Sequence, residues 1–372
     1  MNNHLQRLRH LGAGASLALL ALLIGLAPAS HADSLYIGDQ TDNTVKRFDA
    51  DSGEYLGEFV KKGNSPIKGP RGLIFTPAGD LLVSNQNVGT GKAGTLLLFD
   101  GTTGDFSEAL VRHNDEDAPF APDGIVLVDG TLFVADQASD GKDTPPGRLW
   151  AYSADGVLQS DLTPDPVSEF PGDGSANEFH PRGVVLGPDG LLYVSVVDDL
   201  NPRSADFNPL PGWILRFDPV DKRFVDVFAS HTDSGCAAAL HRPDGLTFGP
   251  DGRLYVTAFR ADAEDNDKIL IFDASGACVD QIDLDQVGQP RAVAQALLFG
   301  PTNQAGENLF VPISGDGPDT GAIRRYNTRT KAFSTLVAPA EQGGALGSGW
   351  YLTFGQTAPD TLEYVEEEAA AP

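Results

Sequence analysis

The stretch that decides the fold reads Pro181-Arg182-Gly183-Val-Val-Leu-Gly-Pro-Asp-Gly-Leu-Leu-Tyr-Val-Ser195. It consists of an apolar run, a turn that contains Gly and a second apolar run, which is typical of a β-hairpin. Similar stretches begin at Pro70, Pro122 and Pro243, and a weaker copy begins at Pro290-Arg291-Ala292 and resumes at Leu297. Repetition of one supersecondary unit along the chain indicates an array of repeats in a single domain.

Two further strands follow each hairpin. The third strand of the unit is recognised six times, as a short segment with an aromatic residue near its end, at residues 45–49, 96–100, 148–152, 214–218, 269–273 and 323–327. Four short strands repeated about six times predict an all-β fold, a six-bladed β-propeller with four-stranded blades. Residues 34–38 match a second strand, and residues 350–354 match the first strand that is missing before it. We therefore expect one blade to combine both ends of the chain, which removes exposed sheet edges.

The first 32 residues have the features of a cleaved signal peptide. Arg7 and Arg9 precede an apolar stretch at 11–26, and Ser30-His31-Ala32 offers the small residues that a signal peptidase accepts. A membrane anchor is the alternative, but the apolar run is short. We expect export to the periplasm or the cell exterior, a propeller over residues 33–365 and a disordered acidic tail at 366–372.

The charge of the 372-residue chain restricts its partners. A formal net charge of -26 argues against binding to nucleic acid or to an anionic membrane, because both require clustered Lys and Arg. No later segment is apolar for long enough to insert into a membrane. We expect a monomer with a small-molecule, glycan or protein ligand. The two cysteines, Cys236 and Cys278, predict a disulfide in an exported protein. Two unpaired buried thiols are the alternative.

The repeated hairpin also predicts a ring of charged side chains. Long connections between second and third strands, and between blades, are expected on one face, where loops usually carry function. At the channel mouth on this face, the residue after each Pro lies at the start of the innermost strand, and the signs alternate: Arg71, Asp123, Arg182, Asp244 and Arg291. These side chains could bind an anionic or polyol ligand. Alternatively, they pair across blades, since opposite charges at about 4 Å attract by about 4 kcal/mol at an effective dielectric of 20.

Polar side chains at the ends of the second strands are candidate ligands for a hard cation such as Ca²⁺, and they are Asp39, Asn85, Asp136 and Asp198. The alternative is that they hydrogen-bond to adjacent loops. Residues 261–267 form an acidic loop that lacks the Gly and the terminal Glu of an EF-hand. His180 and His241 lie near the mouth, where each could act as a general base or cap a loop.

The repeated stretch resembles the NHL-type six-bladed propellers and, more loosely, the gluconolactonase/regucalcin and virginiamycin B lyase families, from about residue 35 to 354. The resemblance implies the fold, but such propellers include lyases, hydrolases, oxidoreductases and binding modules. Similarity to the gluconolactonase-like families implies a metal ion that is held by a Glu at the start of an innermost strand, together with an Asn and an Asp from other blades. This chain has Arg or Asp at the first position, while Asn85 and either Asp136 or Asp198 match the others. The lyase family carries His after Pro in some repeats, where this chain has Arg or Asp.

Two functional hypotheses follow. The first is an exported binding module for a small molecule, a glycan or a protein, with the site on the long-loop face. The alternative is a divalent-cation-dependent lactonase or lyase that acts at the channel mouth. A quinoprotein dehydrogenase is a third hypothesis, because those propellers use similar hairpins.

Overall fold

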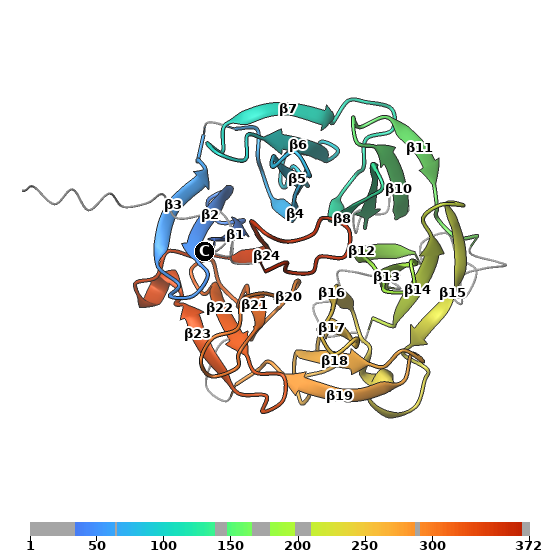
Figure 1. Cartoon of the computed structure of the whole chain (residues 1–372), viewed down its shortest axis with the longest axis vertical. Coiled ribbons are helices and arrows are strands. Elements are labelled where there is room, and N and C mark those ends of the chain that lie inside the picture. Colours follow the sequence, from blue (N-terminus) through green and yellow to red (C-terminus); the bar gives the residue numbers. More distant parts are fainter. Residues whose placement is uncertain are drawn as a thin grey trace, which may run out of the picture. The chain divides into compact units, whose positions relative to one another are not determined.

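The structure, a computed structural model, describes residues 34–63, 65–137, 147–165, 179–197, 210–286 and 291–366. In these residues the strands form six four-stranded antiparallel sheets that surround a common centre (Figure 1). The prediction of an all-β six-bladed propeller is confirmed. The proposed signal peptide and residues 367–372 of the proposed tail lie outside the described residues.

The blades follow one another around the ring in chain order, and the strands run from the channel outward within each blade. Blade 1 contains β24 (Gly349–Phe354), β1 (Ser34–Asp39), β2 (Thr44–Asp49) and β3 (Tyr55–Val60), and blade 2 contains β4 (Pro70–Phe75), β5 (Leu81–Asn85), β6 (Thr95–Phe99) and β7 (Phe106–Val111). Blade 3 contains β8 (Pro122–Val128), β9 (Thr131–Asp136), β10 (Arg148–Ser153) and β11 (Leu158–Asp161), and blade 4 contains β12 (His180–Leu186), β13 (Leu192–Val197), β14 (Gly212–Asp218) and β15 (Arg223–Ser230). Blade 5 contains β16 (Pro243–Phe248), β17 (Leu254–Ala258), β18 (Lys268–Phe272) and β19 (Cys278–Asp283), and blade 6 contains β20 (Leu298–Phe299), β21 (Leu309–Ile313), β22 (Ala322–Tyr326) and β23 (Phe333–Val337).

Both ends of the chain meet in blade 1, as expected. The inner strand β24 pairs with β1, and Leu35 lies opposite Phe354. Because the first and last strands share one sheet, this blade joins the two ends of the chain and closes the ring. Two short 3-10 helices, η2 (Gly235–Ala239) and η3 (Ala340–Gln342), complete the secondary structure of the described residues. No helix in the described ranges has the length and apolarity needed to cross a membrane.

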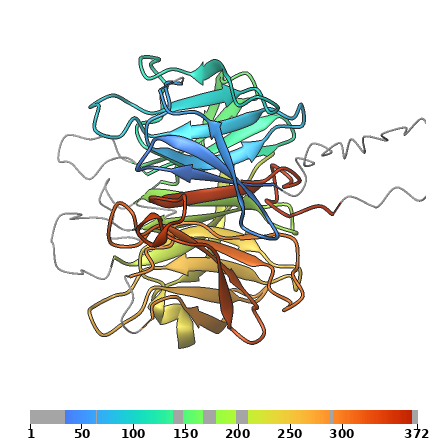
Figure 2. The same ribbon diagram turned by 90° about the vertical axis from the view of Figure 1, so that its left-hand side faces the viewer.

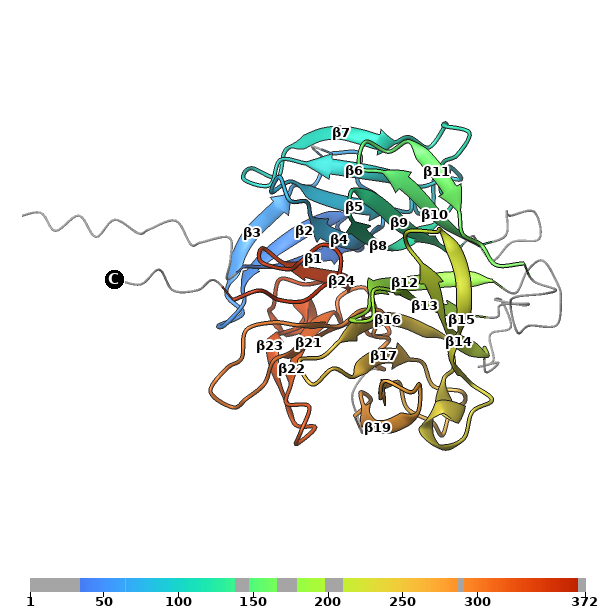
Figure 3. The same ribbon diagram turned by 45° about the vertical axis from the view of Figure 1, so that its right-hand side comes forward.

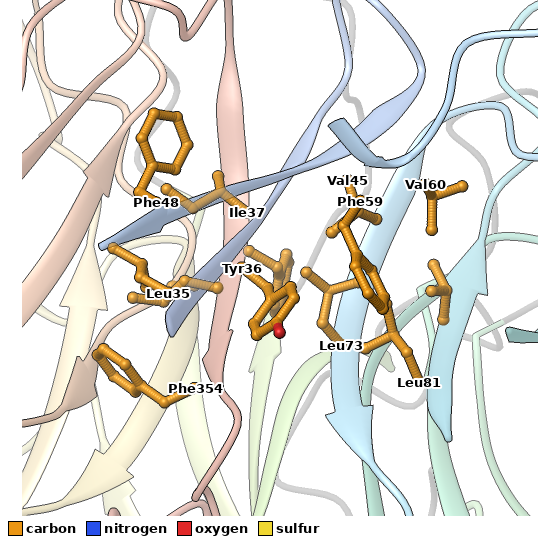
Figure 4. Packing of buried hydrophobic residues seen from close by; sticks show 14 of the residues in the cluster. Leu35, Tyr36, Ile37, Val45, Phe48, Phe59, Val60, Leu73, Leu81 and Phe354 are labelled. Carbon is orange, nitrogen blue, oxygen red and sulfur yellow. The ribbon is translucent and has the colours of Figure 1, made fainter. Parts of the chain in front are cut away.

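Aromatic contacts between blades explain why the second strand of the repeat so often contains Tyr. Tyr36 of β1 lies against Phe59 and Phe75, with ring centroids 5.0 and 4.9 Å away, and these side chains belong to the packed cluster shown in part in Figure 4. In blade 4, Tyr193 packs in the same way against Phe228 and against Phe248 of the next blade. Edge-to-face packing of buried aromatic rings stabilises by about 0.5–1.5 kcal/mol beyond the burial of apolar area.

The predicted disulfide is present and joins Cys236 of η2 to Cys278 of β19, with their Cα atoms 5.4 Å apart. It fastens the connection between blades 4 and 5 to the outermost strand of blade 5. This prediction is confirmed.

The segment that follows β24 crosses the channel, and we call residues 355–366 the strap. In Figure 1 the strap is the dark red chain across the centre of the ring, and Figures 2 and 3 show that it lies at one side of the ring. Its carbonyl groups at Pro359 and Asp360 accept hydrogen bonds from Leu127 of β8 and Leu186 of β12, at 2.8 and 3.1 Å. Leu362 packs against four of the hydrophobic clusters. The strap therefore covers the channel on the face of the inner hairpin turns, opposite the long-loop face.

Candidate functional site

The inner strands share a β-bulge near the start of the strand. In β4, Pro70 pairs with Asn85 and Leu73 pairs with Val83, so Arg71 and Gly72 together oppose a single residue of β5. The same register shift occurs in β8, β12, β16 and β24. A bulge changes the direction of the side chains that it contains. The bulges therefore bring the variable residue of each repeat to the channel mouth.

The second residue of the bulge is constrained by the neighbouring blade. A Cβ atom on Gly72 would lie 2.6 Å from the Asp123 carbonyl oxygen, and one on Gly183 would lie 2.6 Å from the Asp244 carbonyl oxygen. These distances are too short for any side chain, so the fold requires Gly there. The first residue of the bulge does not have to be Gly, and in these repeats it is Arg or Asp.

The alignment of the weak fifth copy needs a correction. A Cβ atom on Gly245 would lie 2.7 Å from the Gln295 carbonyl oxygen, so Gln295 occupies the ring position that the sequence assigned to Arg291. Gln295 is buried, and its Oε1 has no hydrogen-bond partner among the described residues. Arg291 instead forms an ion pair with Asp267 at 2.6 Å. The sequence contains a pattern that could have identified Gln295. Residues Gln295-Ala-Leu-Leu-Phe-Gly-Pro301 align without a gap to Arg71-Gly-Leu-Ile-Phe-Thr-Pro77.

Blade 1 contributes two aromatic residues to the mouth that sequence reasoning missed. By register, Trp350 occupies the position of Arg71, and Tyr351 occupies that of Gly72. The guanidinium carbon of Arg71 lies 3.7 Å from the centroid of the Trp350 ring, close enough for a cation–π interaction. The Tyr351 hydroxyl reaches toward blade 5 and lies 3.4 Å from Oδ1 of Asp244.

Five residues from the inner strands of blades 1 to 5 thus form a buried group, which we call the mouth cluster: Arg71, Asp123, Arg182, Asp244 and Tyr351. Both carboxylates are 0% exposed, and the two guanidinium residues are 3% and 7% exposed. Nη1 of Arg182 lies 3.5 Å from Oδ2 of Asp244. Among the described residues this is the one charge pair of the cluster within 4.0 Å. Arg71 forms no such pair, and its Nη1 donates a hydrogen bond to the Pro70 carbonyl at 3.0 Å. Pairing across blades therefore accounts for only part of the predicted ring.

Several polar atoms of the mouth cluster lack hydrogen-bond partners in the described part of the chain. They are both carboxylate oxygens of Asp123, Nε of Arg71 and Nε of Arg182. Tyr351 is near enough to affect the pKa of Asp123, but no donor meets hydrogen-bond geometry with that carboxylate. A buried polar group without a partner costs about 1–3 kcal/mol, and a charged group costs more. These atoms are the available contact points for a ligand or for water.

Burial dominates the acid–base properties of the mouth cluster. It raises the pKa of Asp123, and it raises the pKa of Asp244 to about 7, with a further contribution from the negative charge of Asp123. Burial also lowers the pKa of Arg71 to about 10, although Asp123 opposes this effect. The pKa of Tyr351 is well above its ordinary value, first through burial and then through the two carboxylates. The cluster therefore retains protons that exposed carboxylates would release.

The candidate metal ligands that the structure describes hold loops together. Asp39 accepts hydrogen bonds from the backbone N–H groups of Gly347 and Ser348 and forms a 2.7 Å ion pair with Lys46. Asp136 accepts from the backbone of Phe120 and Ala121, each at 2.7 Å. Asn85 accepts from the Lys68 backbone at 2.5 Å. Their oxygens thus bind the loops between blades, and the described residues contain no group of three or more His, Cys, Asp or Glu placed to hold a metal. Asp198 lies outside the described residues.

The two candidate histidines lie at or just before the start of an inner strand: His180 is the first residue of β12, and His241 lies in the connection that precedes β16. Nδ1 of His180 is 2.6 Å from the Gln137 carbonyl oxygen, an arrangement that orients a loop. His241 forms an isolated β-bridge with Pro211, and burial lowers its pKa. The ring of His180 thus contacts a neighbouring loop, and the backbone of His241 is paired with another one.

Comparison with known proteins shows similarity at the level of the fold. No protein-family model and no curated protein sequence matches the chain. A putative 6-phosphogluconolactonase from Bacteroides uniformis superposes with a TM-score of 0.50 at 14% identity, over 87% of this chain and 99% of that one. The periplasmic gluconolactonase from Pseudomonas aeruginosa gives 0.49 at 21% identity over 81% of each chain, and a PQQ-bound aldose sugar dehydrogenase from Streptomyces coelicolor gives 0.45 at 15% identity over 73% and 82%. The chain is a six-bladed β-propeller similar in structure to gluconolactonase-type proteins at low sequence identity.

Proposed function

We propose that the chain binds a small polar molecule at the mouth cluster, on the long-loop face of the propeller. The observation that carries this proposal is the fully buried carboxylate of Asp123, which has no hydrogen-bond donor among the described residues. Nε atoms of Arg71 and Arg182 are unpaired in the same cluster. A ligand with hydrogen-bond donors and acceptors would satisfy these groups together.

The channel below the mouth cluster favours a small ligand. Its walls consist of glycines and aliphatic residues of the inner strands, among them Leu73, Val184 and Leu246, and Leu362 of the strap closes its far end. A polar molecule gains no hydrogen bonds from such walls. The ligand therefore remains at the mouth and does not pass through the propeller.

Export is part of the proposal. The disulfide between Cys236 and Cys278 supports it, because disulfides form and persist in oxidising compartments. We propose that the protein acts as a monomer in the periplasm or outside the cell.

A melting-temperature screen tests the binding proposal. Wild-type protein is compared with Arg182→Met in a panel of sugars, sugar acids, other small carboxylates and amino acids. Arg253→Met is the matched control, because Arg253 is exposed and pairs with Asp251 in the hairpin turn on the opposite face. We expect at least one compound class to raise the melting temperature of the wild type and of Arg253→Met, but not of Arg182→Met. Equal responses of all three proteins would refute the proposed site.

The second candidate function is catalysis at the same mouth, as a lactonase or lyase. The pKa of Asp244, about 7, is the observation that favours it, because a general acid or base works best with a pKa near the operating pH. Turnover in a panel of lactones and esters that Asp244→Asn abolishes would support this candidate. Absence of turnover across that panel, in protein that binds a ligand in the melting screen, would contradict it.

A further inference from the structure

We propose that Asp123 and Asp244 share one proton at neutral pH in the unliganded protein, beside the protonated hydroxyl of Tyr351, and that the mouth cluster consequently binds a small oxyanion. The inference rests on the proposed function, because it specifies the chemistry of the ligand at the same site.

The Tyr351 hydroxyl of blade 1 lies 3.4 Å from Oδ1 of the buried Asp244 in blade 5. It is also close enough to the buried Asp123 of blade 3 to influence the pKa of that carboxyl group. A phenol has a single proton to donate, so it cannot stabilise two carboxylates at once. A proton added to the pair turns one carboxylate into a donor, and the groups then titrate as one unit.

The neighbouring guanidinium groups do not remove the need for this proton. Arg71 stacks on Trp350 and donates from Nη1 to a backbone carbonyl. The separation of 3.5 Å between Arg182 and Asp244 exceeds the roughly 2.7–2.9 Å of a strong charge-assisted hydrogen bond. Asp123 receives no hydrogen bond from either arginine. Sharing a proton reduces the cost of two buried negative charges.

The charges around the Asp123 and Asp244 carboxyl groups favour a negatively charged ligand. Arg71, Arg182 and Arg242 all interact electrostatically with both Asp123 and Asp244. Tyr351 also interacts electrostatically with both carboxyl groups. The guanidinium groups of Arg71 and Arg182, set against two carboxyl groups that share a proton, already leave an excess of positive charge. A carboxylate or phosphate oxygen fits this surrounding, whereas an ammonium group does not.

Infrared spectroscopy of the unliganded protein at pH 7 tests the shared proton without any ligand. We expect a carbonyl band from a protonated carboxylic acid, which disappears in Asp244→Asn and shifts in Tyr351→Phe. Asp129→Asn is the control, because Asp129 is exposed in a hairpin turn on the opposite face. No such band in the wild type would overturn the shared proton while leaving the proposed binding function intact.

Calorimetric titration with acetate tests the ligand class. Repeated at pH 7 in two buffers with different ionisation enthalpies, it also reports proton exchange on binding. We expect acetate to bind the wild type and Asp129→Asn, to bind Arg182→Met at least ten-fold more weakly, and to change the protonation of the site in the wild type more than in Tyr351→Phe. If the infrared band is present but acetate and inorganic phosphate both fail to bind, the oxyanion assignment is overturned. A compound of another class from the melting screen would then still support the proposed function.

Discussion

Replacement of Asp244 by Asn should change how the stability of the propeller depends on pH. In the wild type the carboxyl group is completely buried in the mouth cluster, and its pKa rises from 3.8 to about 7, mainly because burial disfavours the charged form. Below pH 3.8, the carboxyl group of Asp244 is protonated in both the folded and the unfolded chain. As pH rises, the unfolded chain releases the proton first, so the wild type loses stability until the folded group also ionises near pH 7. Asn cannot ionise, and the variant lacks this loss.

The expected magnitude follows from the two pKa values. The difference between 3.8 and about 7 corresponds to about 4 kcal/mol of unfolding free energy. An Asn side chain has nearly the same volume as Asp, so the variant keeps the packing of the channel. Relative to the wild type, its free energy of unfolding should therefore increase by an amount on the order of 4 kcal/mol between about pH 4 and pH 7. The substitution also alters the contact with Arg182. That effect shifts the free energy of unfolding by the same amount at each pH and does not change how the difference between variant and wild type depends on pH.

Urea denaturation followed by tryptophan fluorescence at several pH values measures this difference. Asp129→Asn again serves as the control, because that carboxylate is exposed and lies on the opposite face. Parallel pH profiles for the wild type and Asp244→Asn would refute the reasoning, because Asp244 would then have the same proton affinity in the folded and unfolded chains.

Three other predictions concern stability, and denaturation in urea checks each of them. Cys236→Ser should cost about 4 kcal/mol, because the bond to Cys278 closes a separation of 42 residues; an unchanged midpoint would contradict this role. Gly183→Ala should cost about 1–3 kcal/mol, because the new Cβ would lie 2.4 Å from a methyl carbon of Leu246; a neutral effect would mean that the blades separate easily. Leu362→Ala should cost about 2 kcal/mol, because the side chain packs on four clusters, and no loss would show that the strap is not fixed.

The blade architecture was predictable because its determinants are local. The turn glycines, the apolar alternation and the repeated Tyr of the second strand each follow from constraints within a blade or between neighbouring blades. Four of the five predicted ring residues lie at the mouth for the same reason. Gln295 was missed because extra residues precede β20 and move Arg291 away from the channel.

Other parts of the site depend on tertiary contacts that sequence patterns do not record. Tyr351 occupies a position where the other four bulges have Gly, so its role follows from the closure of the ring and not from the repeat. The contact of Leu362 with several blades likewise depends on the path of the strap. Asp39 and Asp136 are residues of the type that binds cations. Their carboxylate oxygens instead accept hydrogen bonds from backbone N–H groups of loops that lie near them only in the folded ring.

A high-resolution crystal structure of the unliganded and acetate-soaked protein tests whether the mouth cluster is a binding site. We expect ordered water in the unliganded mouth cluster, in contact with the Asp123 carboxylate and with Nε of Arg71 or Arg182. In the soaked crystal we expect acetate to replace water at the guanidinium groups. The contradicting result is a closed ring in which Arg71 forms a bidentate pair with Asp123, so that every donor and acceptor of the cluster is satisfied within the protein.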